Sequence, residues 1–242
     1  MMDPRISIID KRLSQIKRII AVASGKGGVG KSLIASTMAL ILAEKGYKVG
    51  LLDLDLYGPS SHIILGVEKT FPEEEKGIVP PKVKNVEFMT IAFFAEDRPI
   101  PLRGDDVTNV ILEILSITRW SNLGFLVVDM PPGIGDEVLD AIRFLKRSEF
   151  LIVTTPSKVA ISTVMRLIKL LVEIKAPVLG LIENMKLIDT DLVIKAANEA
   201  NIKYLGAIPF DHNLERSIGN PDELLKTEFT NNLRNILSKV LA

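Results

Sequence analysis

Hydrophobic residues form short, nearly continuous runs along the chain, and longer stretches with helical spacing of apolar and polar residues separate these runs. Buried parallel strands have the first pattern and surface helices have the second. The pattern predicts strands at 18–23, 47–53, 86–93, 124–129, 149–154, 177–182 and 203–208. It predicts helices at 6–16, 33–43, 60–65, 106–119, 136–146, 158–174, 190–200, 211–218 and 230–241, and an exposed loop at 68–82. This alternation indicates the α/β class, with a doubly wound, mostly parallel sheet flanked by helices.

No break in composition divides the 242 residues, so we expect a single domain over 1–242, with 1–17 as a helical lead-in and 230–241 as a closing helix. The 30 basic and 30 acidic residues cancel, which gives no strong sign of nucleic-acid binding. The absence of cysteine excludes disulfides, thiolate metal sites and a cysteine nucleophile. We find no signal-peptide pattern and no apolar run near the ~20 residues that span a bilayer, so we expect a cytoplasmic protein.

A glycine-rich segment joins the first predicted strand to the helix at 33–43. Such a segment lets successive backbone N–H groups point into one concavity at a helix N-terminus, where a phosphate binds. Lys31 would reach the β- and γ-phosphates, and the Ser32 hydroxyl would take a Mg²⁺ position. A glycine turn without a ligand is the alternative, but both flanking elements are present. We therefore predict a nucleotide-binding loop made of Gly25, Lys26, Gly27, Gly28, Val29, Gly30, Lys31, Ser32 and Leu33.

Two other predicted strands end in acidic residues, at the edge where open α/β sheets bind ligands. Asp129 is expected to hold Mg²⁺ through water, and Asp53, still within its strand, is expected beside the same metal. Asp55 is expected to polarise the attacking water and to act in the switch. After Asp129, Pro132 and Gly133 form a loop in which the Gly133 N–H would face the γ-phosphate and respond to its removal. Turn-forming or helix-capping roles for the Asp53–Asp55 pair remain open.

Lys26, directly after the first glycine of the loop, resembles the signature lysine of the deviant Walker A group of P-loop ATPases, which includes MinD, ParA, ArsA and the nitrogenase iron protein. Within this group the chain is most similar to the Mrp branch of iron–sulfur carrier ATPases. The matching stretches follow the family's order through nearly the whole chain: 20–32, 49–60, 102–104, Trp120, 128–137, 154–156, 180–185 and 205–211.

The resemblance implies a P-loop NTPase fold and a Mg²⁺-dependent enzyme that converts ATP and water to ADP and phosphate. It also implies a homodimer with ATP enclosed between the subunits. Lys26 would reach the partner's phosphates and act as a catalytic residue together with Lys31 and Asp55.

Base recognition is also implied by the resemblance. Asn184, placed after a predicted strand, matches the residue that reads adenine in the family. A wall for the base would come from the loop that contains Pro209 and Phe210. Without the family context, a turn-forming role would suit Asn184 better.

One departure from the family concerns the cluster site. Mrp-type carriers usually follow the Glu-Asn-Met segment with a Cys-x-x-Cys pair that binds a shared cluster at the dimer interface. Here residues 185–191 read Met-Lys-Leu-Ile-Asp-Thr-Asp, without cysteine. Because thiolates hold iron–sulfur clusters in proteins, we expect this chain to bind none in the family's way. Asp189 and Asp191 are candidates for a hard-cation site or a helix N-cap, and the cap is the commoner role.

These observations predict an ATP-binding, weakly hydrolysing dimeric switch of the Mrp family, linked to iron–sulfur cluster assembly or transfer through an unidentified protein partner. The alternative is a positioning ATPase similar to MinD or ParA, acting with a membrane, DNA or a division partner. The predicted helix at 230–241 favours the alternative, because one face carries Leu233, Ile236, Leu237, Val240 and Leu241. We expect this face to dock on the protein's own core, with membrane contact as the second option.

Overall fold

The apolar runs of the sequence assemble into one central β-sheet. The computed structural model describes residues 3–67, 72–94 and 105–241. The first half of the described chain contains α1 (Pro4–Ser14), β1 (Arg18–Ser24), α2 (Lys31–Glu44), β2 (Val49–Asp53), α3 (Ser61–Ile64), β3 (Glu73–Glu74), β4 (Ile78–Val79), β5 (Lys82–Val83), β6 (Val86–Thr90), the 3₁₀ turn η1 (Ile91–Phe94) and α4 (Asp105–Ile117). The second half contains β7 (Phe125–Asp129), α5 (Asp136–Phe144), β8 (Ser148–Thr154), α6 (Lys158–Glu173), β9 (Val178–Lys186), α7 (Leu192–Glu199), β10 (Tyr204–Pro209), the 3₁₀ turn η2 (Leu214–Ser217), α8 (Pro221–Leu224) and α9 (Glu228–Leu237).

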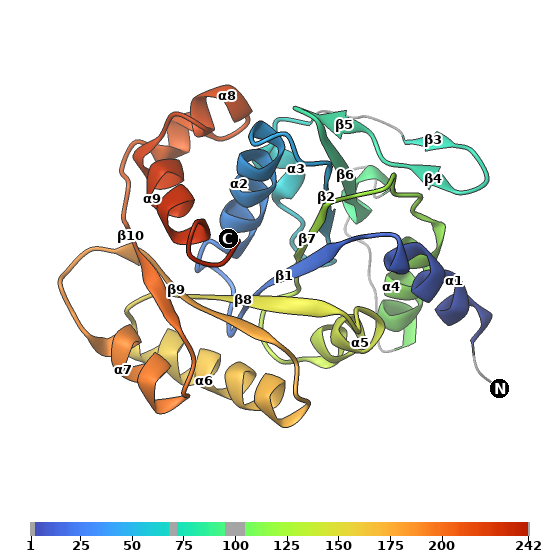
Figure 1. The fold of residues 1–242 in the computed structure, drawn as a ribbon. Helices are drawn as coiled ribbons and strands as arrows, with labels where there is room; N and C mark the ends of the chain where they lie inside the picture. Colours follow the sequence, from blue (N-terminus) through green and yellow to red (C-terminus); the bar gives the residue numbers. More distant parts are fainter. Residues whose placement is uncertain (1–2, 68–71, 95–104, 242) are drawn as a thin grey trace.

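Within the described residues the sheet has eight strands in the order β10-β9-β8-β1-β7-β2-β6-β5 (Figure 1). Neighbouring strands are parallel except at one edge, where β5 runs antiparallel to β6. The chain builds β2 and β6 on one side of β1 and later adds β8, β9 and β10 on the other. The loop after β1 therefore lies at the switch point of the sheet, where such folds bind ligands. The predicted α/β class and doubly wound, mostly parallel sheet are confirmed.

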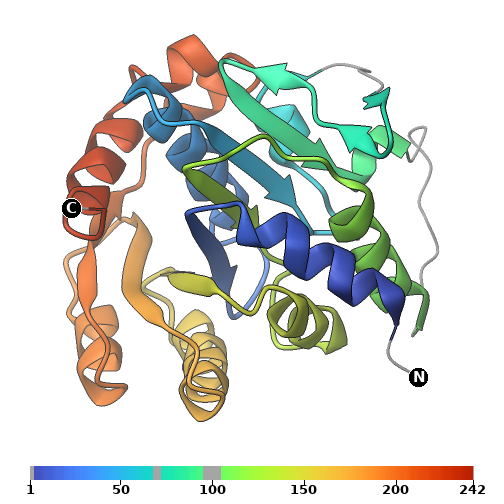
Figure 2. The ribbon, with the colours of Figure 1, turned by 45° about the vertical axis from the view of Figure 1, so that its right-hand side comes forward.

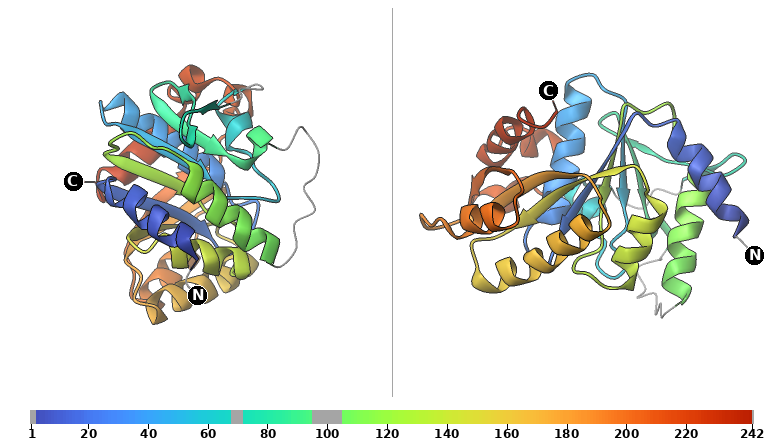
Figure 3. Two further views of the ribbon diagram at one scale, coloured as in Figure 1. Left: turned by 90° about the vertical axis from the view of Figure 1, so that its right-hand side faces the viewer. Right: turned by 60° about the horizontal axis from the view of Figure 1, so that its bottom comes forward.

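Helices cover both faces of the sheet. Figures 1 and 3 show α2, α3 and α9 on one face and α4, α5, α6 and α7 on the other. Figure 2 shows α1 in front of the sheet, where it packs against α4 and α5. α2 lies between the sheet and α9, so nearly all of its side chains are buried, and this burial explains its almost uninterrupted apolar sequence.

The closing helix α9 docks on the core, as expected. Its buried side chains include Phe229, Leu233, Ile236 and Leu237, which face α2 and β10. The helix starts earlier than the predicted 230–241, because the Thr227 side chain caps its N-terminus, and it ends earlier, at Leu237. No helix in the part of the chain that the structure describes combines the length and the apolar character needed to cross a bilayer.

The end predicted for the strand at 177–182 is wrong, because β9 continues to Lys186. β10 pairs with β9 as far as Pro209 opposite Lys186, and this pairing carries the strand past the polar residues Glu183 and Asn184. Asn184 is therefore inside a strand and not after one. Met185 has a φ of 56°, so the last residues of the strand depart from regular geometry.

Three other predicted elements differ from the structure. The strand predicted at 86–93 ends at Thr90, because its partner β2 ends at Asp53 opposite that residue. The helix predicted at 211–218 is the 3₁₀ turn η2, and Gly219, with a φ of 83°, separates it from α8. The predicted loop at 68–82 contains the short antiparallel pair β3–β4. The motif at 102–104 lies outside the described residues.

The docking of α9 leads to a stability prediction. Leu233 is a fully buried residue of α9, so Leu233→Ala should lower the free energy of unfolding by about 2–5 kcal/mol in urea titrations followed by circular dichroism. Val172→Ala, at an exposed position on α6, is the matched control and should change it by about 0.5 kcal/mol or less. A Leu233→Ala protein with unchanged stability and reduced binding to lipid vesicles would show that this face serves a membrane instead.

Candidate nucleotide-binding site

The loop between β1 and α2 has the backbone of a phosphate cradle. Gly28 and Gly30 have positive φ values, 76° and 84°, that turn the chain into the helix. A Cβ at Gly25 would lie 2.3 Å from the backbone nitrogen of Val164, so only glycine lets the loop lie directly on α6. Within the described chain the N–H groups of residues 27–33 donate no hydrogen bond. They are therefore available to phosphate oxygens at the α2 N-terminus.

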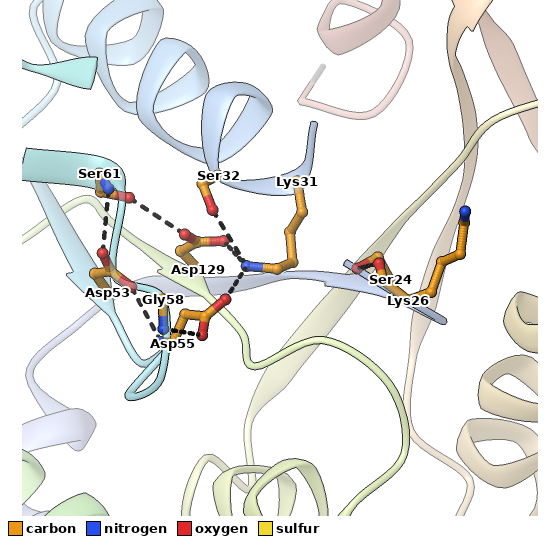
Figure 4. Close-up of polar contacts among 9 residues, drawn as sticks. All are labelled: Ser24, Lys26, Lys31, Ser32, Asp53, Asp55, Gly58, Ser61 and Asp129. Atoms are coloured by element: carbon orange, nitrogen blue, oxygen red, sulfur yellow. Dashed lines mark hydrogen bonds and ion pairs between the residues drawn. The ribbon is translucent and has the colours of Figure 1, made fainter. Parts of the chain in front are cut away.

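Lys31 lies at the centre of the polar cluster in Figure 4. Its Nζ atom is 2.5 Å from Oδ1 of Asp129 and 3.8 Å from Oδ2 of Asp55, and it donates to Oγ of Ser32 at 3.4 Å. The Lys31 side chain is only 5% exposed. The predicted phosphate lysine, metal serine and two of the predicted aspartates thus meet at one point.

Asp53 joins this cluster through the sheet and through α3. It faces Asp129 in register across the parallel pair β2–β7, and both carboxylates are fully buried. Ser61, the first residue of α3, connects them: its N–H donates to Asp53 at 3.2 Å and its hydroxyl donates to Asp129 at 3.2 Å. Asp53 also accepts the N–H of Asp55 at 3.0 Å. Sequence reasoning did not identify Ser61, because a serine after a Gly-Pro-Ser turn gives no signal of its own.

The cluster holds more negative than positive charge. Burial raises the pKa of Asp53 to about 8, and the facing carboxylate of Asp129 adds to this shift. Burial also raises the pKa of Asp129, although Lys31 acts in the opposite direction. Among the described residues, the ion pairs of this cluster have Lys31 as their only cation. A further positive charge at this place would be stabilised by the three aspartates.

The donor set suits Mg²⁺ as that positive charge. Ser32, Asp53 and Asp129 offer hard oxygen ligands, which Mg²⁺ prefers, and the excess negative charge favours a divalent cation. In the described part of the chain no three His, Asp or Glu side chains converge into a metal cage. Mg²⁺ at such sites is commonly bound by one or two protein groups together with nucleotide phosphates, whose charge it neutralises.

The predicted switch loop is attached to the end of β1. The Gly133 N–H donates to the Ser24 carbonyl at 2.9 Å, and the Met130 N–H donates to the Val22 carbonyl at 3.1 Å. The expectation that the Gly133 N–H faces a phosphate therefore needs correction for this conformation, because that donor is already used. Pro132 and Gly133 are half-buried beside the phosphate loop, and their switch role stays a prediction.

Asn184 contacts the phosphate loop from β9. Its side chain is 2% exposed, and Nδ2 donates to the Val29 carbonyl at 2.9 Å. A Cβ on Gly30 would lie 2.2 Å from this Nδ2 atom, so Gly30 leaves the space that Asn184 fills. The amide thus fixes the loop backbone, and adenine reading by Asn184 stays a prediction.

Three other predicted residues lie outside the lysine–aspartate cluster. Pro209 ends β10, and Phe210, which is exposed, follows it at the carboxyl edge of the sheet. The rings of Phe210 and His212 pack edge to face, with 4.9 Å between their centroids. Lys26 is half-buried, and in Figure 4 its side chain points away from Lys31.

Residues 185–191 stand where the family resemblance would place a cysteine pair. Two ion pairs hold them, one to a lysine of β9 and one to a lysine of α7. Asp189 pairs with Lys186 at 3.0 Å, and Asp191 pairs with Lys195 at 2.8 Å. Asp191 stands at the N-cap position of α7, but its side chain makes no cap hydrogen bond, because the carboxylate faces Lys195. Thr190 accepts the first free N–H of the helix instead. The capping role expected for these aspartates is therefore wrong.

Comparisons with known proteins agree with this geometry. The family model described as the NUBPL iron-transfer P-loop NTPase, of the ParA group, matches residues 15–242. The chain belongs to this family. The chain is 36% identical over 255 residues to an iron–sulfur cluster carrier protein of Aquifex aeolicus, covering 96% of this chain and 70% of the relative. A carrier protein of Pseudomonas fragi is 42% identical over 177 residues, covering 72% of this chain and 62% of the relative.

Solved structures show the same fold as this chain. A nucleotide-binding protein of Archaeoglobus fulgidus in complex with ADP matches it with a TM-score of 0.78 at 29% identity, covering 93% of this chain and 95% of that chain. The cell-division ATPase MinD of Pyrococcus furiosus matches with a TM-score of 0.71 at 21% identity, covering 93% and 100% of the two chains, and shows the fold alone. The predicted family and the P-loop NTPase fold are confirmed. The chain spans 70% or less of the carrier relatives named above.

The position of Asn184 leads to a binding prediction. Asn184→Ala removes the hydrogen bond that fixes the phosphate loop, so we expect weaker binding of both ATP and GTP, by about tenfold each. Titration calorimetry would measure both affinities. Asn198→Ala, at an exposed position on α7, is the control and should bind like the wild type. A loss confined to ATP would contradict the loop-fixing role and support the reading of adenine.

Proposed function

We propose that this protein is a dimeric, Mg²⁺-dependent ATPase that acts as a switch in iron–sulfur cluster assembly or transfer. The observation that supports the enzyme most directly is the contact of Lys31 with Asp129 and Asp55 at the end of the glycine loop. Phosphoryl transfer to water requires an oriented nucleophile and stabilisation of charge, and little covalent chemistry from the protein. This cluster offers both kinds of group.

Lys31 and Asp129 have roles that change when a nucleotide binds. To reach the β- and γ-phosphates, the Lys31 ammonium has to leave Asp129. Mg²⁺ brought in with ATP would be held near Ser32, Asp53 and Asp129 and would supply positive charge beside these carboxylates. The Asp129 carboxylate would then face this charge in place of the Lys31 ammonium.

Asp55 is suited to orient the attacking water. Its Oδ1 atom accepts the Gly58 N–H at 3.1 Å, which fixes the side chain on the loop after β2. Asp53 is fully buried, and its carboxylate already accepts the N–H groups of Asp55 and Ser61. Asp55 is therefore the residue that accepts a hydrogen bond from the attacking water. Asp53 holds the loop in place by accepting the N–H of Asp55.

The dimer is proposed to form through the carboxyl edge of the sheet. Exposed apolar side chains gather in the loops and helix starts that follow the carboxyl ends of the strands: Tyr57, Ile134, Val159, Leu187, Ile188 and Phe210. Apolar surface of this kind, rimmed by polar groups, is typical of protein interfaces. Lys26 lies on the same edge, where it would meet the phosphates held by a second copy. Pro209 and Phe210 would form a wall for the base there.

The carrier role is supported by the similarity to iron–sulfur cluster carrier proteins. The lack of cysteine determines how such a role would work. A chain without thiols handles a cluster as cargo only when another protein supplies the thiolate ligands. We therefore propose a protein partner rich in cluster-binding cysteines. A positioning role like that of MinD is the second candidate, and the burial of the α9 apolar face disfavours a membrane-bound form of it.

The ATPase proposal leads to a kinetic prediction. Asp55→Asn should bind ATP as the wild type does but lower the turnover number by about 100-fold or more, because the water loses its oriented acceptor. Phosphate release and titration calorimetry measure the two effects. With ATP and Mg²⁺ the variant should accumulate as a dimer on light scattering, whereas Asp55→Asn combined with Lys26→Ala should stay monomeric. Normal hydrolysis by Asp55→Asn would assign the water to another residue.

The carrier role leads to a partner prediction. Tagged Asp55→Asn protein, held with ATP and Mg²⁺, should enrich cluster scaffolds or cluster-dependent enzymes from lysate of the source organism, as identified by mass spectrometry. A Lys31→Ala protein, which lacks the phosphate lysine, is the control and should not enrich them. Enrichment of division, membrane or chromosome proteins would contradict the carrier role and favour positioning.

A further inference from the structure

A second pocket lies at the opposite end of the sheet from the phosphate loop. It has a volume of about 470 Å³ and lies between α1 and the residues just before β7. The residues that line it and carry the argument are Ile8, Lys11, Arg12, Arg119 and Trp120. β1 separates the two sites with seven residues, which corresponds to roughly 20 Å at the rise of a strand.

Three of the lining side chains are cations. Arg119 is paired at 3.4 Å with Glu75, an exposed residue. Lys11 and Arg12 have no acidic partner among the described residues. The neighbouring acids are engaged elsewhere, because Asp10 pairs with Lys146 and Glu113 pairs with Arg5. The pocket therefore has a net positive charge.

The Arg12 guanidinium is held in place by one hydrogen bond, and its buried Nε atom has no acceptor among the described residues. Its Nη1 atom donates to the Thr118 carbonyl at 3.0 Å, which fixes the plane of the group. Its Nε atom is buried and donates to no acceptor within the described part of the chain. Burial and, second, the like charge of Arg119 lower the pKa of Arg12. An anion in the pocket that Arg12 lines would relieve the repulsion between the two guanidinium groups.

The remaining lining is apolar and aromatic. Ile8 is exposed on α1, and Trp120 is half-buried, with its six-membered ring above Gly50 of β2. A purely inorganic ion would leave this side of the pocket without a partner. A ligand with an apolar or flat part beside its charge would contact both sides.

We propose that this pocket binds a small organic anion, with a phosphate or carboxylate group held by Arg12, Arg119 and Lys11 and an apolar part held against Ile8 and Trp120. The pocket is separate from the nucleotide site, because the two lie at opposite ends of β1. Trp120 is one of the residues that carried the family resemblance, and the nucleotide site does not use it.

The single tryptophan of the sequence makes a direct test possible, because all tryptophan emission comes from this pocket. Phenyl phosphate is the probe, titrated at constant ionic strength into full-length Lys31→Ala protein, in which the phosphate loop is disabled. We expect a saturable change in emission, and Arg12→Gln in the same background should weaken the apparent affinity by about tenfold or more. Benzoate and inorganic phosphate, titrated in parallel, distinguish the carboxylate from the phosphate source and measure the contribution of the ring.

Two further variants keep the test decisive. Lys146→Gln removes a cation on the surface beyond α1 that pairs with Asp10, and it should leave the titration unchanged. Lys11→Gln removes an exposed pocket cation without disturbing a hydrogen bond, so it replaces Arg12→Gln if thermal melting shows that variant to be unfolded. No saturable change with phenyl phosphate or benzoate, or equal affinities in the pocket variants and in Lys146→Gln, would show that the pocket binds no such anion.

Discussion

The nucleotide-binding edge depends on the way three largely buried aspartates share one lysine. Asp53 and Asp129 face each other because β2 and β7 are parallel and in register, and burial raises the pKa of both. Lys31 balances only part of this charge. The start of α3 and the loop after β2 are tied to the same carboxylates through backbone N–H groups. The same buried carboxylates therefore hold the surrounding loops in place and favour the binding of a further cation.

Local patterns explain why much of the fold and site could be predicted from sequence. The glycine loop, Lys31 and Ser32 lie between β1 and α2, and Asp53 and Asp129 end their strands, because short apolar strands followed by these residues leave little choice of geometry. Their binding roles stay predictions. Features that depend on partners distant in sequence could not be predicted. β9 passes through the polar residue Asn184 because β10 pairs beside it, and the Gly133 N–H is taken by a carbonyl of β1.

The role of the closing helix α9 also depends on a partner that is distant in sequence. The apolar face of α9 has a pattern that suits a membrane surface and a protein core equally well. What distinguishes the two is α2, whose outward side is also apolar and would face water without α9. The role of an amphipathic helix can therefore be assigned only when the apolar surface that it packs against is known.

The close approach of Asn184 to the phosphate loop also constrains how the sequence can diverge. The Asn184 side chain fills the space that a side chain at position 30 would occupy. Gly30 also has a φ of 84°, so a larger residue there would be strained even beside a smaller residue at position 184. Glycine at position 30 therefore meets two separate requirements, the turn of the loop after β1 and the space taken by a side chain from β9, and a smaller residue at 184 would remove only the second.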